Sequence, residues 1–411
     1  EAIKKGLQPL ADIVLIQKEE NIEEVAKNYI TEEVKTVEEA IQGAKDIIAE
    51  IVSDDPELRK LLRELIYNKA QITCELDETK ENAPTYETYA HYTEAINKIP
   101  SHRVLAINRG EKEECLKVKI ELNPELALQI IYKEYIKGEN RCSELVKEAI
   151  DDGYERLLFP SLEREIRSSL TDMANEQAIK MFDSNLRPLL LQPPVKGKVV
   201  LGLDPAYRTG CKIAVVDPTG KVLDTCVIYP TPPQNKIEEA EAKLTEFINK
   251  YNVDIISIGN GTASKESEIF VANLIKKQTR KVEYIVVNEA GASVYSASKL
   301  GAEEFPDFDV AQRSAVSIAR RLQDPLAELI KIDVKSIGVG QYQHDMPQNR
   351  LSEVLGWVVE DCVNSVGVDL NTASYSLLSY VSGLNMGIAK NIVAYRTKNG
   401  AFKNRAELIN V

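Results

Sequence analysis

Asp204 ends a short apolar stretch, and the loop after it carries residues that can hold an anion. The stretch, residues 199–217, reads VVLGLDPAYRTGCKIAVVD and places Arg208, Gly210 and Lys212 in the loop. Three interpretations are open: a phosphate cradle, a metal-holding active site and a plain hairpin. A phosphate-binding P-loop needs GxxxxGK followed by Ser or Thr, between a strand and a helix. No Ser or Thr follows Lys212 and the next residues are strand-like, which excludes a P-loop.

The composition limits the class of protein. The 411 residues suggest about two to four domains. No apolar run approaches the roughly 18 residues of a membrane span and the first residues do not resemble a signal peptide, so we expect a cytoplasmic protein with no membrane partner. Six scattered cysteines without a CxxC pair and three unpaired histidines predict no structural zinc site, and we expect no cofactor. The net charge of −13 argues against nucleic acid only if that charge is evenly spread.

Residues 197–323 alternate between short apolar runs and helical patterns. The runs KVVLGLD, CKIAVVD and KVLDTCVIYP are joined by tight connections and predict three hairpin-linked strands. A helix, the strand DIISIG, a helix near residues 265–277, the strand VEYIVV and a closing helix from about Asp309 follow. This order, three antiparallel strands extended by two parallel ones, is that of an RNase H-like α/β fold. In that fold strand ends present carboxylates to metal ions, and Asp204 lies at such an end.

Residues 1–194 are mainly helical in pattern. Thr36 and Glu39 predict a capping box, and apolar residues then recur at spacings of three and four over residues 37–51. That face is predicted to pack on other helices. Residues 115–122 alternate between apolar and polar side chains and predict a strand.

A second long helix is predicted over residues 161–187. Pro188 is expected to end it, because proline cannot continue a helix. The residues predicted to face inward are Leu162, Ile166, Leu170, Met173, Phe182 and Leu186. The sequence LLLQPPVKGK after the helix is typical of a short, stiff linker.

Residues 326–411 predict a helix-hairpin-helix module. Two helices flank the sequence SGLNMG, residues 382–387, whose turn contains Gly383, Asn385 and Gly387. The second helix directs its first backbone N–H groups outward, where they can hold a phosphate without reading bases. Most such hairpins carry glycine where Asn385 stands, and asparagine tolerates the left-handed backbone that this turn is expected to need.

The same region is basic although the whole chain is acidic. Residues 371–411 contain five basic residues against the single acid Glu407. Such a local excess is typical of binding to a phosphate backbone. The basic residues, which we predict to bind nucleic acid, are Lys390, Arg396, Lys398, Lys403 and Arg405.

Seven segments resemble the bacterial Tex transcription accessory proteins. They are SHRVLAINRGE, FPSLEREIR, GLDPAYRTGCK, RRLQDPLAELIKI, SIGVGQYQHDM, VVEDCVNSVGVDLNTAS and YRTKNGAFKNRAEL. The resemblance extends over essentially the whole chain. The resemblance implies a YqgF-like middle domain, related to RNase H and RuvC-type nucleases, and a helix-hairpin-helix module after it. The family usually adds an early helix-turn-helix region and a C-terminal S1 domain. We therefore expect a chain that is truncated at both ends, with its second hairpin incomplete.

By similarity to YqgF proteins, three acids are candidate or vestigial catalytic residues. Asp204 matches the acid of the first strand, Glu289 matches the acid after the last strand, and Asp309 lies at the start of the closing helix. Two-metal hydrolysis of a phosphodiester needs several carboxylates converging on ions about 3.5 to 4 Å apart. The turn after DIISIG contains no acid, which counts against such a site. The structural alternative is that these acids cap helices and pair with Arg208 or Arg313.

Three further features complete the expectations. The segment GNGTASKESE either holds a nucleotide phosphate or caps the next helix through Thr262 and Ser264. Arg320 and Arg321 face either a phosphate or the neighbouring helices. The DPAYRTG loop after Asp204 is predicted to be a structured hairpin, bonded to the rest of its domain, that hydrolyses nothing.

The sequence thus indicates a multidomain, mostly helical protein with a central RNase H-like domain. We interpret it as a nucleic-acid-binding accessory factor of transcription that contacts RNA or single-stranded DNA without sequence preference. The link to transcription comes from the resemblance alone. The expected partners are RNA or DNA and the transcription machinery. The alternatives are a nuclease that depends on a metal such as Mg²⁺, and a helical scaffold that binds proteins.

Overall fold

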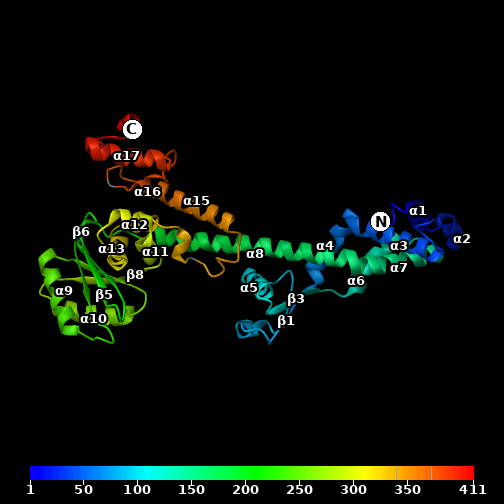
Figure 1. The fold of residues 1–411 in the computed structure, drawn as a ribbon, viewed down its shortest axis with the longest axis horizontal. Coiled ribbons are helices and arrows are strands. Elements are labelled where there is room, and N and C mark those ends of the chain that lie inside the picture. Colours follow the sequence, from blue (N-terminus) through cyan, green and yellow to red (C-terminus); the bar gives the residue numbers. More distant parts are fainter. Residues whose placement is uncertain (339, 372) are drawn as a thin grey trace. The chain divides into compact units, whose positions relative to one another are not determined.

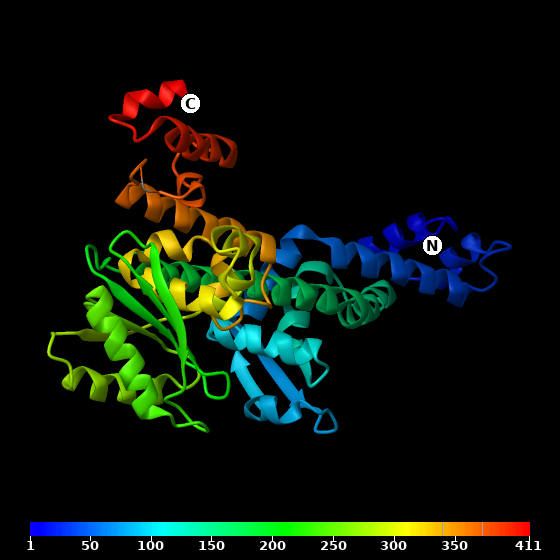
Figure 2. The ribbon, with the colours of Figure 1, turned by 60° about the vertical axis from the view of Figure 1, so that its left-hand side comes forward.

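The computed structural model describes residues 1–338, 340–371 and 373–411. The chain divides into two compact units, Glu1–Ala178 and Ile179–Val411. Figure 1 and Figure 2 colour the chain from the first residues, in blue, to the last, in red. The border between the units falls inside one long helix, α8 (Phe159–Leu190). The boundaries predicted for three regions stay predictions.

Unit Glu1–Ala178 is mainly helical, as the sequence predicts. Thr36 caps α3, where its hydroxyl accepts a hydrogen bond from the backbone N–H of Glu39 at 3.1 Å. The carboxylate of Glu39 accepts a hydrogen bond from the N–H of Lys35. In a standard capping box this donor would be the N–H of Thr36, so the box is displaced by one residue. The predicted apolar face is buried at Ile47 and Ile48, whereas Ile51 is exposed. The helices are α1 (Gln8–Ile16), α2 (Ile22–Ala26), α3 (Val37–Asp54), α4 (Pro56–Lys69), α5 (Ser101–Lys112), α6 (Pro124–Tyr135), α7 (Arg141–Gly153) and α8 (Phe159–Leu190).

The long helix α8 corrects two predictions. It continues through Pro188 to Leu190, so the expectation that Pro188 ends it is wrong. Leu186 and Leu190 are both buried one turn apart, and their packing keeps the last turn helical although proline donates no hydrogen bond. Met173, predicted to face inward, is 50% exposed, because Ala174 takes the buried position instead.

A small antiparallel sheet accompanies the helices of this unit. It consists of β1 (Gln71–Leu76), β2 (His91–Ala95) and β3 (Leu116–Glu121), in the order β2-β1-β3. The strand predicted over residues 115–122 is confirmed as β3. Ile107 of α5 packs against Ile72 and Cys74, so one face of this sheet is buried.

The second unit contains the sheet that positions Asp204. Its strands are β4 (Val200–Asp204), β5 (Cys211–Val216), β6 (Val222–Ile228), β7 (Ile255–Gly259) and β8 (Glu283–Val287). They lie in the order β6-β5-β4-β7-β8. β4, β5 and β6 pair antiparallel, while β4, β7 and β8 pair parallel. The predicted RNase H-like order of strands is confirmed.

Helices cover both faces of this sheet. On one face Phe247 of α9 (Ile237–Tyr251) and Val271 of α10 (Ser264–Lys276) share a buried cluster with the strands. On the other face α13 (Val310–Gln323) packs through Ala315 and Ala319. Two short helices, α11 (Ala292–Ala297) and α12 (Lys299–Glu304), precede α13 and were not predicted.

Gly202 fixes how closely α13 approaches the sheet. A Cβ atom added at Gly202 would lie 2.3 Å from the carbonyl oxygen of Ala315 and 2.9 Å from the Cβ of Ala319. Any side chain at this position would therefore push α13 away. Ser257 on β7 donates a hydrogen bond to the carbonyl of Ile318 at 2.9 Å, which holds the helix across the strands.

The remaining helices follow α13. They are α14 (Pro325–Leu329), α15 (Gln348–Val366), α16 (Tyr375–Leu378) and α17 (Met386–Asn399). α16 and α17 are the two helices predicted to flank the hairpin. Among the residues that the structure describes, no helix is both long enough and apolar enough to pass through a membrane.

Candidate functional site

Asp204 lies at the end of β4, after four buried residues. Burial raises the pKa of its carboxyl group above the ordinary value. A hydrogen bond from the hydroxyl of Ser314 on α13 and the positive charge of Lys212 oppose this effect but are weaker. The carboxyl group therefore takes up a proton more readily than an exposed aspartate does.

Glu289, in the loop after β8, lies beside Asp204. Burial raises the pKa of Glu289, and the negative charge of Asp204 raises it further. The backbone N–H of Gly261 and the charge of Arg321 lower it. The Oε2 atom of Glu289 is buried and has no hydrogen-bond partner among the described residues. Two carboxyl groups with raised pKa values thus share one partly buried location.

Two glycines make room for this carboxylate. A Cβ at Gly261 would lie 1.6 Å from Oε1 of Glu289, and a Cβ at Gly259 would lie 2.3 Å from Oε2. The side chain of Asn260 between them accepts a hydrogen bond from the N–H of Glu289 at 3.0 Å. The sequence Gly-Asn-Gly therefore positions Glu289. The spacing of these glycines was visible in the sequence, but their partner was not.

Asp309 is the residue before α13 and forms its capping box. Its Oδ1 atom accepts a hydrogen bond from the N–H of Gln312 at 2.7 Å, while Gln312 accepts one from the N–H of Asp309 at 2.9 Å. From α13 it is Ser314, five residues later, that bonds Asp204. Within the described ranges, no three His, Cys, Asp or Glu residues are grouped so that they could hold a metal ion. The structure brings two of the three predicted acids together and holds the third in a helix cap.

The loop between β4 and β5 is a hydrogen-bonded hairpin, as predicted. Asp204 and Lys212 are cross-strand partners in this antiparallel pair. The hydroxyl of Tyr207 donates to Glu266 at 3.0 Å, and Gln234 donates to the carbonyl of Arg208 at 2.9 Å. The ammonium group of Lys212 donates to the carbonyl of Gly210 and to Thr209 rather than to Asp204. These contacts fix the loop, and among the described ion pairs none involves the carboxylate of Asp204.

The interpretation of GNGTAS as a side-chain cap is wrong. The residue before α10 is Ala263, at a φ of +64°, and among the described hydrogen bonds there is no side-chain cap of this helix. The two neighbouring arginines of α13 both contact the protein. Arg320 donates to the carbonyl of Gly220 at 2.8 Å, and the buried Arg321 donates to the carbonyls of Asn288 and Ala290.

The prediction that Asn385 adopts the left-handed backbone of the hairpin before α17 is wrong. Asn385 is extended, at a φ of −112°, and its side chain accepts a hydrogen bond from the N–H of Ile388 at 2.9 Å. The left-handed residue is Gly383, at a φ of +85°. Among the described contacts, none engages the backbone N–H groups of Met386 and Gly387. These donors point out of the first turn of α17 and are available to an acceptor.

Four of the five predicted basic residues are exposed. These are Lys390, Lys398, Lys403 and Arg405, and none forms an ion pair with another described residue. Lys390 lies over the ring of Tyr375, 5.5 Å from its centroid. Arg396 differs, because its guanidinium donates to the carbonyl of Leu370 at 2.7 Å and partial burial lowers its pKa.

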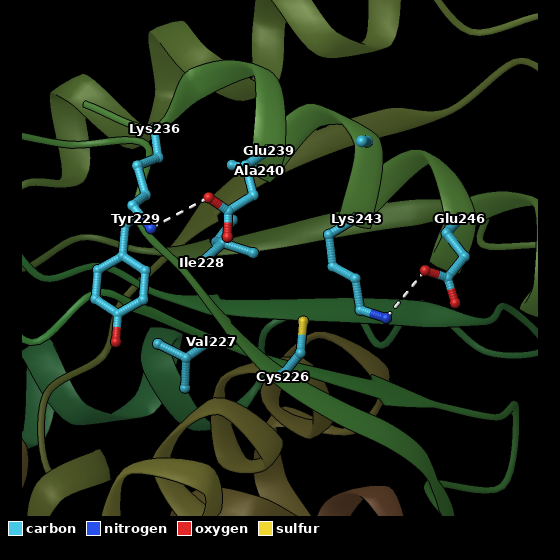
Figure 3. A pocket seen from close by; sticks show the side chains of 10 residues that line it. Cys226, Val227, Ile228, Tyr229, Lys236, Glu239, Ala240, Lys243 and Glu246 are labelled. Atoms are coloured by element: carbon cyan, nitrogen blue, oxygen red, sulfur yellow. Dashed lines mark hydrogen bonds and ion pairs between the residues drawn. The ribbon is translucent and has the colours of Figure 1, made fainter. Parts of the chain in front are cut away.

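A groove of about 350 Å³ lies between β6 and α9 (Figure 3). Its lysines already have partners, because Lys236 pairs with Glu239 at 3.2 Å and Lys243 with Glu246 at 3.0 Å. The residues that line it include none of the predicted acids or the predicted nucleic-acid-binding residues. Two candidate sites remain. One is the carboxyl pair of Asp204 and Glu289. The other, the basic hairpin region, consists of the first turn of α17 and the exposed cations Lys390, Lys398, Lys403 and Arg405.

Comparison with known proteins decides the family. A Tex central region-like family model matches residues 17–182, and the YqgF-like domain model of the Tex protein matches residues 198–323. A helix-hairpin-helix motif matches residues 363–411. The chain belongs to the Tex family. Tex relatives match along nearly the whole of it.

Three relatives illustrate the match. The uncharacterized protein YdcI of Bacillus subtilis is 53% identical over 99% of this chain and 57% of its own length. The transcriptional accessory protein Tex of Neisseria gonorrhoeae is 44% identical over 100% of this chain and 55% of its own. The human S1 RNA-binding domain-containing protein 1 is 40% identical over 93% of this chain and 40% of its own. This Tex chain thus spans about half the length of the bacterial relatives it matches.

Proposed function

We propose that this Tex chain binds the phosphate backbone of RNA or single-stranded DNA without sequence preference, as an accessory factor of transcription in the cytoplasm. The observation that carries the proposal is the set of exposed cations on and after α17. Lys390, Lys398, Lys403 and Arg405 have no anionic partner among the described residues, in a chain whose net charge is −13. Cations that lack protein partners in an acidic chain fit an external polyanion.

The geometry of the hairpin supports a backbone contact. Met386 and Gly387 present backbone N–H groups at the first turn of α17, and Lys390 follows one turn later. A phosphate oxygen accepts hydrogen bonds from such donors, and the positive end of the helix favours its charge. Donors of this kind contact phosphates and carry no base information, so sequence preference is expected to be weak.

The names of the relatives support the two finer parts of the proposal. The Neisseria protein is named a transcriptional accessory protein, which supports a role beside the transcription machinery. The human protein is named for an S1 RNA-binding domain, which supports RNA as the ligand. Because this chain spans only part of each relative, both points remain proposals for it.

A binding assay across three nucleic acids tests the proposal. Labelled RNA, single-stranded DNA and duplex DNA of equal length are titrated with the chain, with Mg²⁺ present so that cleavage is scored in the same samples. We expect binding to RNA and single-stranded DNA, with affinities that differ by less than about threefold between unrelated sequences, and no cleavage. Absence of binding to all three would contradict the proposal and favour a protein-binding scaffold.

The same assay separates binding from the nuclease alternative. Asp204 and Glu289 lie together, but the α13 side chain that bonds Asp204 is the hydroxyl of Ser314 and not a carboxylate. Asp204→Asn is expected to leave nucleic-acid binding within about threefold of the unmodified chain. Cleavage that requires Mg²⁺ or Mn²⁺ and is lost in Asp204→Asn would assign nuclease activity to the carboxyl pair.

A further inference from the structure

The single tryptophan of the chain lies on the surface. Trp357 occupies the outer side of α15 and is 54% exposed. The opposite side of α15 is fully buried and holds the helix in place. The buried residues are Leu351, Leu355, Val358, Val359, Cys362 and Val363. Trp357 therefore does not contribute to the core of this unit, and its exposed ring is the type of side chain that most often anchors a protein interface.

Acidic residues surround this ring. Glu353, Glu360 and Asp361 stand four residues before, three after and four after Trp357, which puts all three on its side of the helix. Glu353 pairs with Arg350 at 3.0 Å, and Asp361 pairs with Arg187. The carboxylate of Glu360 has no ion-pair or hydrogen-bond partner among the described residues. The surface beside the ring thus carries an uncompensated negative charge.

The ring already accepts a cation. The guanidinium of Arg350 lies over Trp357, 5.6 Å from the ring centroid. Attraction between a cation and the face of an indole ring is worth about 0.5 to 1 kcal/mol at an exposed site. An arginine or lysine from outside can reach the exposed part of the ring and the carboxylate of Glu360.

We propose that this side of α15, the Trp357 surface, is the docking site of a partner protein through a segment rich in arginine or lysine. One basic side chain packs against the ring of Trp357 and pairs with Glu360. Glu353 and Asp361 are neutralised by arginines, and the uncompensated carboxylate of Glu360 favours a cationic segment over a phosphate. The Trp357 surface is therefore separate from the basic hairpin region, and its assignment does not rest on the proposed nucleic-acid binding.

Intrinsic fluorescence tests the proposal directly, because Trp357 is the only tryptophan. The probe is a ten-residue peptide with arginine at alternate positions, and the control is the same peptide with glutamate in place of arginine. We expect a saturable change of emission with the arginine peptide, weakened severalfold between about 50 and 200 mM salt. No change, or an equal change with the glutamate peptide, would overturn the proposal.

Variants separate this surface from general attraction to an acidic chain. Glu360→Gln is expected to weaken the arginine peptide about threefold to tenfold. Trp357→Ala removes the fluorescent ring, so binding of the arginine peptide to this variant is measured by calorimetry. We expect it to be weakened at least as much. The matched control is Glu33→Gln, which removes an exposed and unpaired carboxylate in the first unit and is expected to change nothing. Equal affinity of Glu360→Gln and Glu33→Gln would overturn the proposal, as would a stronger emission change with RNA than with the peptide.

Discussion

The guanidinium of Arg396 donates a hydrogen bond to the backbone carbonyl of Leu370 at 2.7 Å. This bond joins the last turn of α17 to the segment before α16. The side chain of Asn371 closes the same segment, because it donates to the carbonyl of Phe402 at 3.0 Å and accepts from the N–H of Phe402 at 2.7 Å. Arg396 thus supports the module that presents the other basic residues.

Replacing Arg396 is expected to lower stability. Arg396→Ala leaves the carbonyl of Leu370 without its donor, which should cost about 1 to 3 kcal/mol in the free energy of unfolding. The neighbouring Lys398→Ala removes an exposed charge and should change stability by less than about 0.5 kcal/mol. Urea denaturation followed by circular dichroism measures both. Equal stability of the two variants would show that the bond to Leu370 contributes nothing.

The carboxyl pair makes stability depend on pH. The pKa values of Asp204 and Glu289 are raised in the folded protein, so their stabilising contribution is complete below the unfolded value near 4 and is lost as pH rises through the folded values. Asp204→Asn removes one titrating group and keeps a partner for Ser314. Its stability relative to the unmodified chain should therefore increase between pH 4.5 and pH 8.

The size of this effect follows from the pKa shift. Each unit by which the pKa of a group is raised corresponds to about 1.4 kcal/mol. Urea denaturation of both chains at several pH values gives the difference directly. A difference between Asp204→Asn and the unmodified chain that stays constant across this range would contradict the raised pKa of Asp204.

The glycine beside Glu289 provides a steric test. In Gly261→Ala the new Cβ would lie 1.6 Å from Oε1 of Glu289, so the carboxylate must move. We expect a loss of about 1 to 3 kcal/mol in the free energy of unfolding. Gly356→Ala in α15 is the matched control, because its Cβ meets no atom within 4 Å. That change should raise stability by about 0.5 to 1 kcal/mol, and thermal unfolding of the two variants should show opposite shifts.

Much of the central domain could be predicted because its signals are local. Apolar runs separated by turns gave the order of β4 to β8, and an aspartate before an amphipathic pattern placed Asp309 at the start of α13. The effect of Pro188 was mispredicted, because the packing of the buried Leu186 and Leu190 stabilises the last turn of α8 more than the missing hydrogen bond destabilises it. Local pattern was sufficient for the strands of this sheet, but it missed α11 and α12 and predicted a side-chain cap of α10 that does not form.

The candidate sites could be predicted only in part, because their partners are distant in the sequence. The pairing of Arg396 with Leu370 spans 26 residues, and nothing in the local sequence marks it. The contact of Ser314 with Asp204 likewise depends on how α13 crosses β4. Residue type and local charge identified the basic region, whereas only the structure separates Arg396 from the four exposed cations.

The salt dependence of RNA binding tests the central claim most directly. The variant replaces Lys390, Lys398, Lys403 and Arg405 by alanine, and the matched control replaces four exposed cations of the first unit, Lys60, Lys69, Lys133 and Arg164. Each lost phosphate contact changes the slope of log affinity against log salt by about 0.7 to 0.9. We predict that the slope becomes shallower by roughly 3 in the first variant and stays unchanged in the control. An unchanged slope in the first variant, or an equal change in both, would place the binding surface elsewhere and contradict this account.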